Sequence, residues 1–202
     1  MLNDRTTPAT LAATRRSGKP REMGPPGPDA AQLRDILTAG VRVPDHGKLT
    51  PWRLVEIAQH DRAAFGEALT AAAEAGLPGA LAAAPDAARL FASQGETLIA
   101  VLSSPKSGTK IPLWEQQLSA GALCLNILIA AHAMGFVASW LSGPAAGSAA
   151  VRDLFGHAGE QLAGFIFIGS PTRDPVDRPR PAIDDIVSLW NPALVSTDII
   201  KG

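Results

Sequence analysis

The chain of 202 residues has the length of one domain, or of one domain with a tail, and can bury a sizeable core. Its 18 Lys and Arg residues balance 19 Asp and Glu residues, and this balance excludes a strongly basic surface for nucleic acid. The single cysteine excludes an internal disulfide, and the N-terminus lacks a signal-peptide pattern, so we expect a cytoplasmic protein.

The first predicted helix begins after the N-cap residue Thr7 and runs from Pro8 to about Arg16. It ends in the polar cluster Arg15-Arg16-Ser17. The simplest interpretation of the two arginines is that they complement the negative end of the helix dipole. The Gly- and Pro-rich residues 18–28 are expected to form an irregular connection.

A second helix is predicted from Asp29, which starts a capping-box pattern, to Gly40. Pro44 prevents its continuation, so that Arg42 and His46 lie on a loop before a strand over residues 54–57. A loop held between two rigid elements is a good place to present a cation and an imidazole to a ligand.

The rest of the chain alternates between helical and strand patterns. Further helices are predicted over residues 61–76, within 77–93, over 113–134 and over 147–155. Further strands are predicted over residues 97–102, 136–140 and 162–168. This order predicts an α+β fold in which helices flank one central sheet, mixed or antiparallel.

The longest predicted helix, residues 113–134, is apolar almost all round between Ala120 and Ala131. A helix of this kind is buried in a core, in a dimer interface or in a membrane. Asn126 and His132 interrupt the apolar run, which favours the buried central helix of a soluble protein or of a dimer. A membrane-associated protein anchored by residues 118–140 is the competing interpretation.

Several families of enzymes are excluded by missing motifs. The sequence has no Gly-x-Ser-x-Gly elbow, no His or Cys pairs at metal-ligand spacing, no Gly-x-Gly-x-x-Gly after a strand and no Walker loop. We therefore expect no metal site. Cys124 lies among apolar residues in the middle of the long helix, which is typical of a core residue rather than a nucleophile.

Three segments in this order resemble the FMN-dependent nitroreductase family, and most of all its compact branch. They are Arg15-Arg16-Ser17, the Arg-x-Pro-Asp-His pattern from Arg42 to His46, and Trp140-Leu141-Ser142. Trp114-Glu115-Gln116 resembles the start of the same long helix in that branch. The resemblance extends from Leu11 to about Pro171.

This resemblance implies an intertwined homodimer with FMN at the subunit interface. The implied FMN contacts are Arg15, Arg16, Ser17, Arg42, His46, Trp140, Leu141 and Ser142, with Arg42 and His46 reaching the flavin from the neighbouring subunit. The end of the long helix is implied to contact NADH or NADPH, through Ala130, Ala131, His132, Ala133, Met134 and Gly135. An apolar helix end also has an ordinary packing explanation, and both interpretations stay open.

One position departs from the family pattern. Close relatives carry an arginine where this chain has Leu141, so one candidate cation for the FMN phosphate is missing. Either Arg15 and Arg42 neutralise the phosphate alone, or Arg178 or Arg180 of the Pro-rich tail compensates. We expect a domain over residues 1–171 and a tail over residues 172–202 that packs on the partner subunit.

The functional hypothesis is an FMN-dependent NAD(P)H oxidoreductase of the nitroreductase type. Hydride would pass from the nicotinamide through FMN to a nitroaromatic or a quinone in a ping-pong reaction, with no catalytic side chain, because the flavin carries the chemistry. The alternative is a non-catalytic homodimer that binds flavin for storage or sensing.

Overall fold

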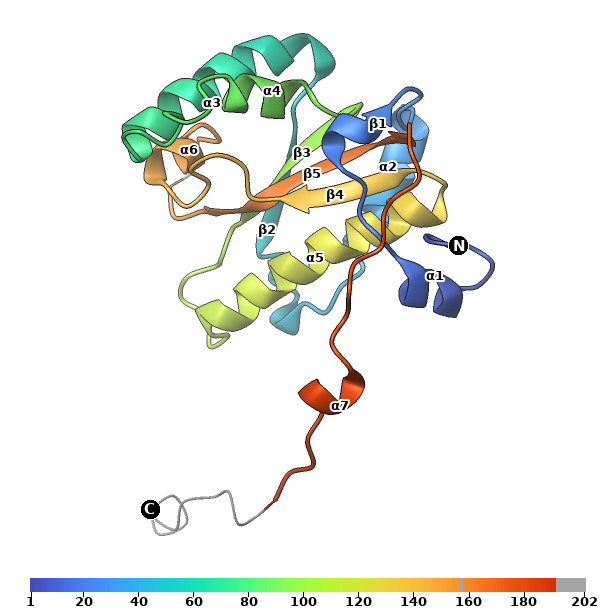
Figure 1. Cartoon of the computed structure of the whole chain (residues 1–202). Coiled ribbons are helices and arrows are strands. Elements are labelled where there is room, and N and C mark those ends of the chain that lie inside the picture. The colour runs from blue at the N-terminus through green and yellow to red at the C-terminus, as the bar shows by residue number, and fades with distance from the viewer. Residues whose placement is uncertain (157, 192–202) are drawn as a thin grey trace.

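A computed structural model describes residues 1–156 and 158–191 and places helices on both faces of a five-stranded sheet (Figure 1). Helices α2 (Ala30–Gly40) and α5 (Leu113–Ala133) cover one face. Helices α3 (Arg62–Gly76), α4 (Ala87–Ser93) and α6 (Ala149–Asp153) cover the other. The predicted α+β class, with helices flanking one central sheet, is confirmed.

The sheet is built around its last strand. Strand β3 (Thr97–Ser103) pairs on one side with β2 (Trp52–Glu56) and on the other with β5 (Gln161–Pro171). The other side of β5 pairs with β4 (Val137–Leu141), and the end of β5 pairs with β1 (Met23–Gly24). Every strand pair among the described residues is antiparallel. Because β5 inserts between β3 and β4, those two strands never pair with each other. Of the two expected arrangements, mixed or antiparallel, the described strands therefore form the antiparallel one.

Side chains of β3 alternate between two clusters, as the period of two in a strand requires. Ile99 and Val101 join the cluster beneath α2 and α5, which includes Leu123. Leu98 and Leu102 join the cluster on the α3 and α4 side. The strand is buried on both faces, which explains why its sequence is continuously apolar rather than alternating.

Helices α2 and α5 approach closely where α2 ends. A Cβ atom on Gly40 would lie 2.5 Å from Cγ1 of Ile127 on α5, so only glycine leaves room for this contact. The close approach brings the loop after α2 onto the surface of α5, where the candidate site lies.

Some predicted boundaries differ from the structure. Helix α1 (Pro8–Thr14) ends at Thr14 rather than near Arg16, and Arg15 is its C-cap. The connection over residues 18–28 contains a 3-10 turn (Pro20–Glu22) and β1, whose partner strand lies far along the chain. Within residues 77–93 only α4 is helical, and within 147–155 only α6 is. The two remaining 3-10 turns are His46–Lys48 and Gln59–Asp61.

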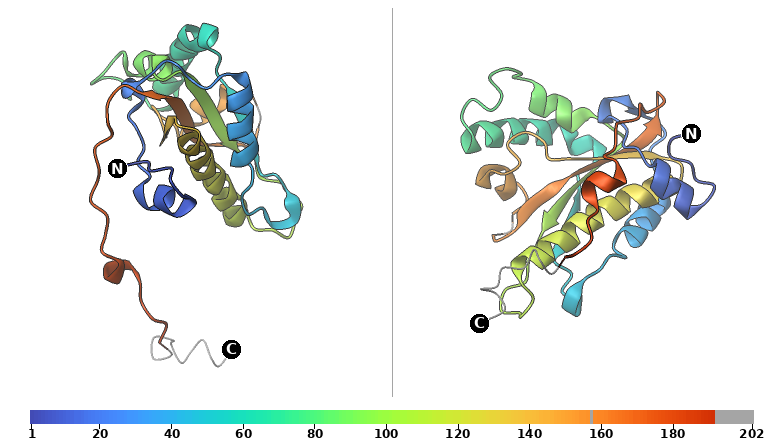
Figure 2. Two further views of the ribbon diagram at one scale, coloured as in Figure 1. Left: turned by 90° about the vertical axis from the view of Figure 1, so that its right-hand side faces the viewer. Right: turned by 60° about the horizontal axis from the view of Figure 1, so that its bottom comes forward.

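The chain leaves the body of the molecule after β5. The tail runs past α1, and the short helix α7 (Ile183–Ile186) stands away from the sheet and its helices (Figures 1 and 2). Residues 192–202 of the predicted tail lie outside the described residues. Within the described part of the chain, no helix combines the length and the apolarity needed to cross a bilayer.

Candidate functional site

Polar side chains of α5 hold the loop that follows α2. The amide of Asn126 donates to the carbonyl oxygen of Arg42 at 3.3 Å, and the hydroxyl of Ser119 donates to that of Pro44 at 2.5 Å. Residues 115, 119 and 126 are four and seven positions apart, so they lie on one face of the helix. The loop therefore runs antiparallel to α5, and hydrogen bonds hold it against the helix at two of these positions.

A third hydrogen bond between the loop and α5 joins two side chains, those of His46 and Glu115. Nδ1 of His46 lies 2.6 Å from Oε1 of Glu115, with 62% of the histidine side chain and 33% of the glutamate side chain exposed. The carboxylate of Asp45 accepts hydrogen bonds from the backbone N–H groups of Leu49 and Thr50 at 3.1 and 2.8 Å. These contacts fix the backbone on both sides of the imidazole.

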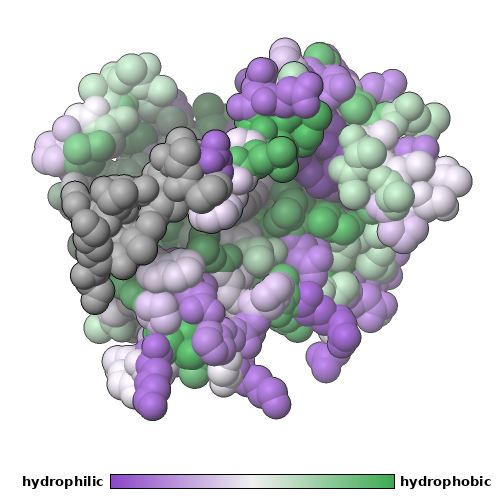
Figure 3. All heavy atoms as spheres, turned by 90° about the horizontal axis from the view of Figure 1, so that it is seen from below, coloured by the Kyte–Doolittle hydropathy of each residue, from purple (hydrophilic) through white to green (hydrophobic). Residues whose placement is uncertain are grey.

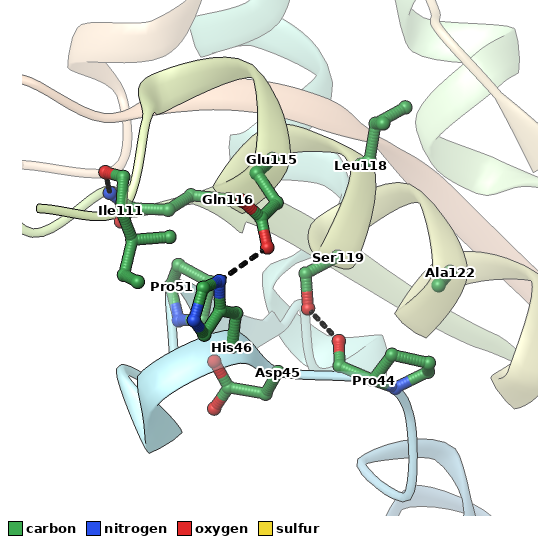
Figure 4. Close-up of a pocket in the computed structure, with 10 residues that line it drawn as sticks. All are labelled: Pro44, Asp45, His46, Pro51, Ile111, Glu115, Gln116, Leu118, Ser119 and Ala122. Atoms are coloured by element: carbon green, nitrogen blue, oxygen red, sulfur yellow. Dashed lines mark hydrogen bonds and ion pairs between the residues drawn. The ribbon is translucent and has the colours of Figure 1, made fainter.

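A cavity of about 290 Å³ opens between this loop and the N-terminal half of α5 (Figure 4). Its walls are mainly apolar, with Pro44, Ile111 and Leu118 among them, and His46 and Glu115 lie at its edge. An apolar cavity with a few polar groups is the usual form of a site for a small molecule.

The first polar cluster lies at the other end of α5. Nη1 of Arg15 donates to Oγ of Ser17 at 3.2 Å, and Nη1 of Arg16 donates to the carbonyl oxygen of Ser17 at 3.1 Å. Nε of Arg16 donates to the carbonyl oxygen of Val176 at 2.8 Å. The tail thus crosses the cluster that the first helix presents.

The tail also brings further positive charge. Partial burial lowers the pKa of Arg16, and the positive charges of Arg178, Arg180 and Arg15 lower it further, while the carboxylate of Asp177 acts in the opposite direction. Asp177 also pairs with Arg180 at 3.9 Å, so one carboxylate faces four guanidinium groups. These groups still repel one another, and an anion bound between them would relieve that repulsion.

The segment Trp140-Leu141-Ser142 divides between the two faces of the sheet. Trp140 is 41% exposed, and a Cβ atom on Gly121 of α5 would lie 3.8 Å from its ring atom Cη2. Nε1 of Trp140 donates to the carbonyl oxygen of Ala163 at 3.0 Å. Leu141 packs instead with the cluster on the α3 and α4 side, and Ser142 is exposed. At position 141 the chain therefore uses an apolar side chain for packing.

The end of α5 combines packing and exposure. His132 is 1% exposed, its Nδ1 lies 3.2 Å from the carbonyl oxygen of Phe136, and burial lowers its pKa to about 4. Its Nε2 has no hydrogen-bond partner among the described residues. Ala130 is half-buried and Ala131 is buried, whereas residues 133–135 are exposed. Packing explains the buried members of this predicted nucleotide-contact stretch, and only its last three residues reach the surface.

One chain does not bring the predicted FMN contacts together. His46 lies against Glu115 near the start of α5, whereas Arg15 acts electrostatically on His132 near its end. Seventeen residues of α-helix separate Glu115 from His132, which corresponds to roughly 26 Å along the axis. That separation exceeds the length of an FMN molecule.

Two contacts of the site lay outside the sequence predictions. The Trp114-Glu115-Gln116 motif includes Glu115 but does not predict its hydrogen bond with His46. A usable signal was present, because Glu115, Ser119 and Asn126 are polar residues on one face of an otherwise apolar helix. The contact of Arg16 with Val176 had no such signal, since it depends on the path of the tail.

Cys124 is buried in the core, and burial raises the pKa of its thiol to about 12, which confirms its interpretation as a packing residue. Within the described residues, no group of three or more His, Cys, Asp or Glu side chains is placed to hold a metal ion.

Comparison with known proteins identifies the family of this chain. A model of the nitroreductase family matches residues 12–170. The chain belongs to the nitroreductase family. It is 35% identical, over 162 residues, to the Escherichia coli (strain K12) protein named "Putative NAD(P)H nitroreductase YdjA", and the match covers 80% of this chain and 86% of the relative. The prediction of a flavin oxidoreductase of the nitroreductase family is confirmed at the level of the family.

Solved structures of nitroreductases share the fold. A nitroreductase-like protein from Bacillus cereus superposes with a TM-score of 0.74 at 19% identity, covering 92% of this chain and 96% of its own. A nitroreductase with bound FMN from Bacteroides fragilis NCTC 9343 superposes with a TM-score of 0.67 at 16% identity, covering 91% and 97% of the two chains. The nitroreductase-like fold is therefore confirmed.

Proposed function

We propose that this protein is a homodimeric FMN-dependent NAD(P)H oxidoreductase that reduces a small oxidised acceptor such as a nitroaromatic or a quinone. The observation that carries the proposal is the separation of two groups of candidate FMN contacts along α5, with the arginine cluster near one end and the His46 loop near the other. Two copies of α5 that run antiparallel across a two-fold axis would bring the start of one helix beside the end of the other. Each interface site would then draw the arginines from one chain and His46 from its partner.

The residues near the end of α5 fit the phosphate of FMN. Arg15 and Arg16 are joined through Ser17, and Arg178 and Arg180 lie close enough to act on Arg16 electrostatically. Arginine and hydroxyl donors are suited to a phosphate group that carries about two negative charges. The tail arginines thus offer a cation in place of the one that Leu141 does not provide.

The surface of α5 fits a partner helix. Leu118 and Leu125, seven positions apart, are 65% and 43% exposed, and Gly121 and Ala122 between them would allow a second helix to approach closely. Figure 3, which views the molecule from below, shows apolar residues gathered in a hollow on this side. An apolar helix face of this kind is covered in a stable protein, and a second copy of α5 is the partner that the two-part site requires.

The tail carries a second apolar group. Ile183, Ile186, Val187, Leu189 and Trp190 are each more than half exposed in the single chain. We expect them to pack on the partner subunit, since an isolated apolar segment of this size is unfavourable in water.

When bound, FMN would accept hydride from NADH or NADPH and pass it to the acceptor. The chain's own residues would bind and orient the cofactor: arginines at the phosphate, Trp140 and the apolar wall of α5 near the ring, and His46 from the partner. The proposed role of these side chains is therefore to hold and orient the cofactor, and none of them is assigned a catalytic step.

The decisive experiment is spectroscopic. The purified protein should show the visible absorption of a flavin, or gain it after addition of FMN, and NADH or NADPH should bleach that absorption under anaerobic conditions. A flavin band that neither nucleotide bleaches would favour the alternative, a flavin-binding homodimer for storage or sensing. A protein that refuses FMN altogether would reject the proposed function.

A further inference from the structure

We propose that Glu115 is a positioning residue that selects which imidazole nitrogen of His46 faces the cofactor of the partner subunit. The proposal rests on the proposed function for the identity of that cofactor. The hydrogen bond between the two side chains is a feature of this chain alone. It can therefore be tested separately from the proposed function.

The contact between His46 and Glu115 lies in a loop that other hydrogen bonds already hold in place. Exposed ion pairs are usually mobile, because two long side chains must be ordered to form them. Here the backbone at His46 is already fixed, through the hydroxyl of Ser119 on Pro44 and through Asp45 on the following N–H groups. Glu115 belongs to the same face of α5 as Ser119, and its carboxylate reaches Nδ1 at 2.6 Å (Figure 4).

The chemistry of the pair determines the tautomer. A carboxylate accepts hydrogen bonds and cannot donate them, so Nδ1 of His46 must carry the proton in this contact. Nε2 is then left for a ligand, as an acceptor when the imidazole is neutral and as a donor when it is protonated. No residue of the described chain hydrogen-bonds Nε2, and 62% of the side chain is exposed. The side chain therefore has one nitrogen bound and the other available.

The chain offers a contrasting pair. Nε2 of His60 lies 3.4 Å from the carboxylate of the adjacent Asp61, and these side chains are 83% and 63% exposed. No other described side chain holds His60 in place, so we use it as a surface histidine whose imidazole is not fixed. Replacing His60 by alanine is the matched control for each replacement of His46.

The tautomer can be measured without the cofactor. NMR of the imidazole nitrogens in the full-length protein should show the proton of neutral His46 on Nδ1, whereas His60 should show the tautomer mixture of free histidine. In Glu115→Ala, His46 should revert to that mixture. In Glu115→Gln, whose amide can either accept from Nδ1 or donate to it, the preference for a proton on Nδ1 should weaken. A wild-type His46 with its proton mainly on Nε2 would overturn the proposal.

Cofactor affinity tests the role of the pair. Glu115→Ala should raise the Kd of FMN by about threefold to tenfold, the fold-change expected from one lost hydrogen bond. In Glu115→Gln, which keeps the size of the side chain but not the acceptor-only chemistry, the Kd should lie between those of the wild type and Glu115→Ala. In a His46→Ala background, Glu115→Ala should have no further effect, because the glutamate acts only through the histidine. His60→Ala should leave the Kd unchanged.

The outcomes separate the two hypotheses. Equal losses of affinity from Glu115→Ala in the presence and absence of His46 would overturn the positioning role, as would a wild-type Kd in Glu115→Ala when His46→Ala weakens binding. If the wild-type protein binds no FMN, the proposed function fails together with the cofactor role of the pair. The tautomer measurement would then still decide whether Glu115 determines the state of His46.

Discussion

Nε of Arg16 donates a hydrogen bond to the carbonyl oxygen of Val176 at 2.8 Å and so joins residues that lie 160 positions apart in the sequence. The backbone N–H of Thr172 donates to the carbonyl oxygen of Glu22 at 3.0 Å and ties the tail to the body just before this contact. Together they carry the tail arginines to the cluster at the end of α1, so the tail is part of the proposed phosphate site.

Replacing Arg178 and Arg180 together by alanine should weaken FMN binding by about tenfold or more, because charge-assisted hydrogen bonds to a phosphate are strong. Riboflavin has no phosphate, so its Kd should be the same in the variant and in the wild type. Fluorescence titration of the apoprotein with both ligands measures the difference.

Replacing Arg34, an exposed arginine on α2, by alanine is the control for the removal of a positive charge outside the tail. It should not alter FMN binding. Equal weakening of FMN and riboflavin in the tail variant would contradict a phosphate role and indicate a structural one.

Introducing a charge on the exposed face of α5 should dissociate the dimer. Leu118→Glu would place a carboxylate in the proposed interface, where desolvation is unfavourable, and light scattering should then report a monomer that has lost FMN. Leu90→Glu on α4, where the leucine is 60% exposed against 65% for Leu118, should remain a dimer. A dimer with full FMN content in Leu118→Glu would exclude α5 from the interface.

Burial of His132 should make stability depend on pH. Its pKa falls from 6.5 to about 4 in the folded chain, so above pH 6.5 both states are neutral and its contribution is complete. Between pH 6.5 and 4 the unfolded chain binds a proton that the folded chain does not, and the free energy of unfolding should fall by up to about 3 kcal/mol.

Urea titrations across this range measure the effect. In His132→Asn the side-chain amide can still donate to Phe136, and this part of the pH dependence should disappear. His60→Asn, at an 83% exposed position, should retain it. Parallel pH curves for the wild type and His132→Asn would show that His132 is not the responsible group.

The close contact of α2 with α5 predicts a destabilising substitution. In Gly40→Ala the new methyl group would lie 2.5 Å from Cγ1 of Ile127, so the helices must separate, at a cost of about 1–3 kcal/mol in the free energy of unfolding. The same change at Gly147, where no atom lies within 4 Å of the place that a methyl group would take, should have little effect. Equal stabilities of the two variants in chemical denaturation would refute the packing argument.

Local sequence signals were sufficient for the main elements of this fold. The capping residues Thr7 and Asp29 start α1 and α2 as predicted, and the continuous apolar pattern identifies β3 as a buried strand. These signals succeed because helix caps and strand periodicity depend on residues a few positions apart. The motifs around Arg15 and Arg42 likewise indicated the family, since each occupies one short segment.

Tertiary structure alone decided how these segments combine. The antiparallel sheet depends on β5 entering between β3 and β4, and β1 exists only because the end of β5 lies beside it. The pairing of His46 with Glu115 and of Arg16 with Val176 likewise joins segments distant in sequence. Such contacts depend on the relative placement of whole elements, which the free energy of the packed core determines, and no local pattern of residues encodes it.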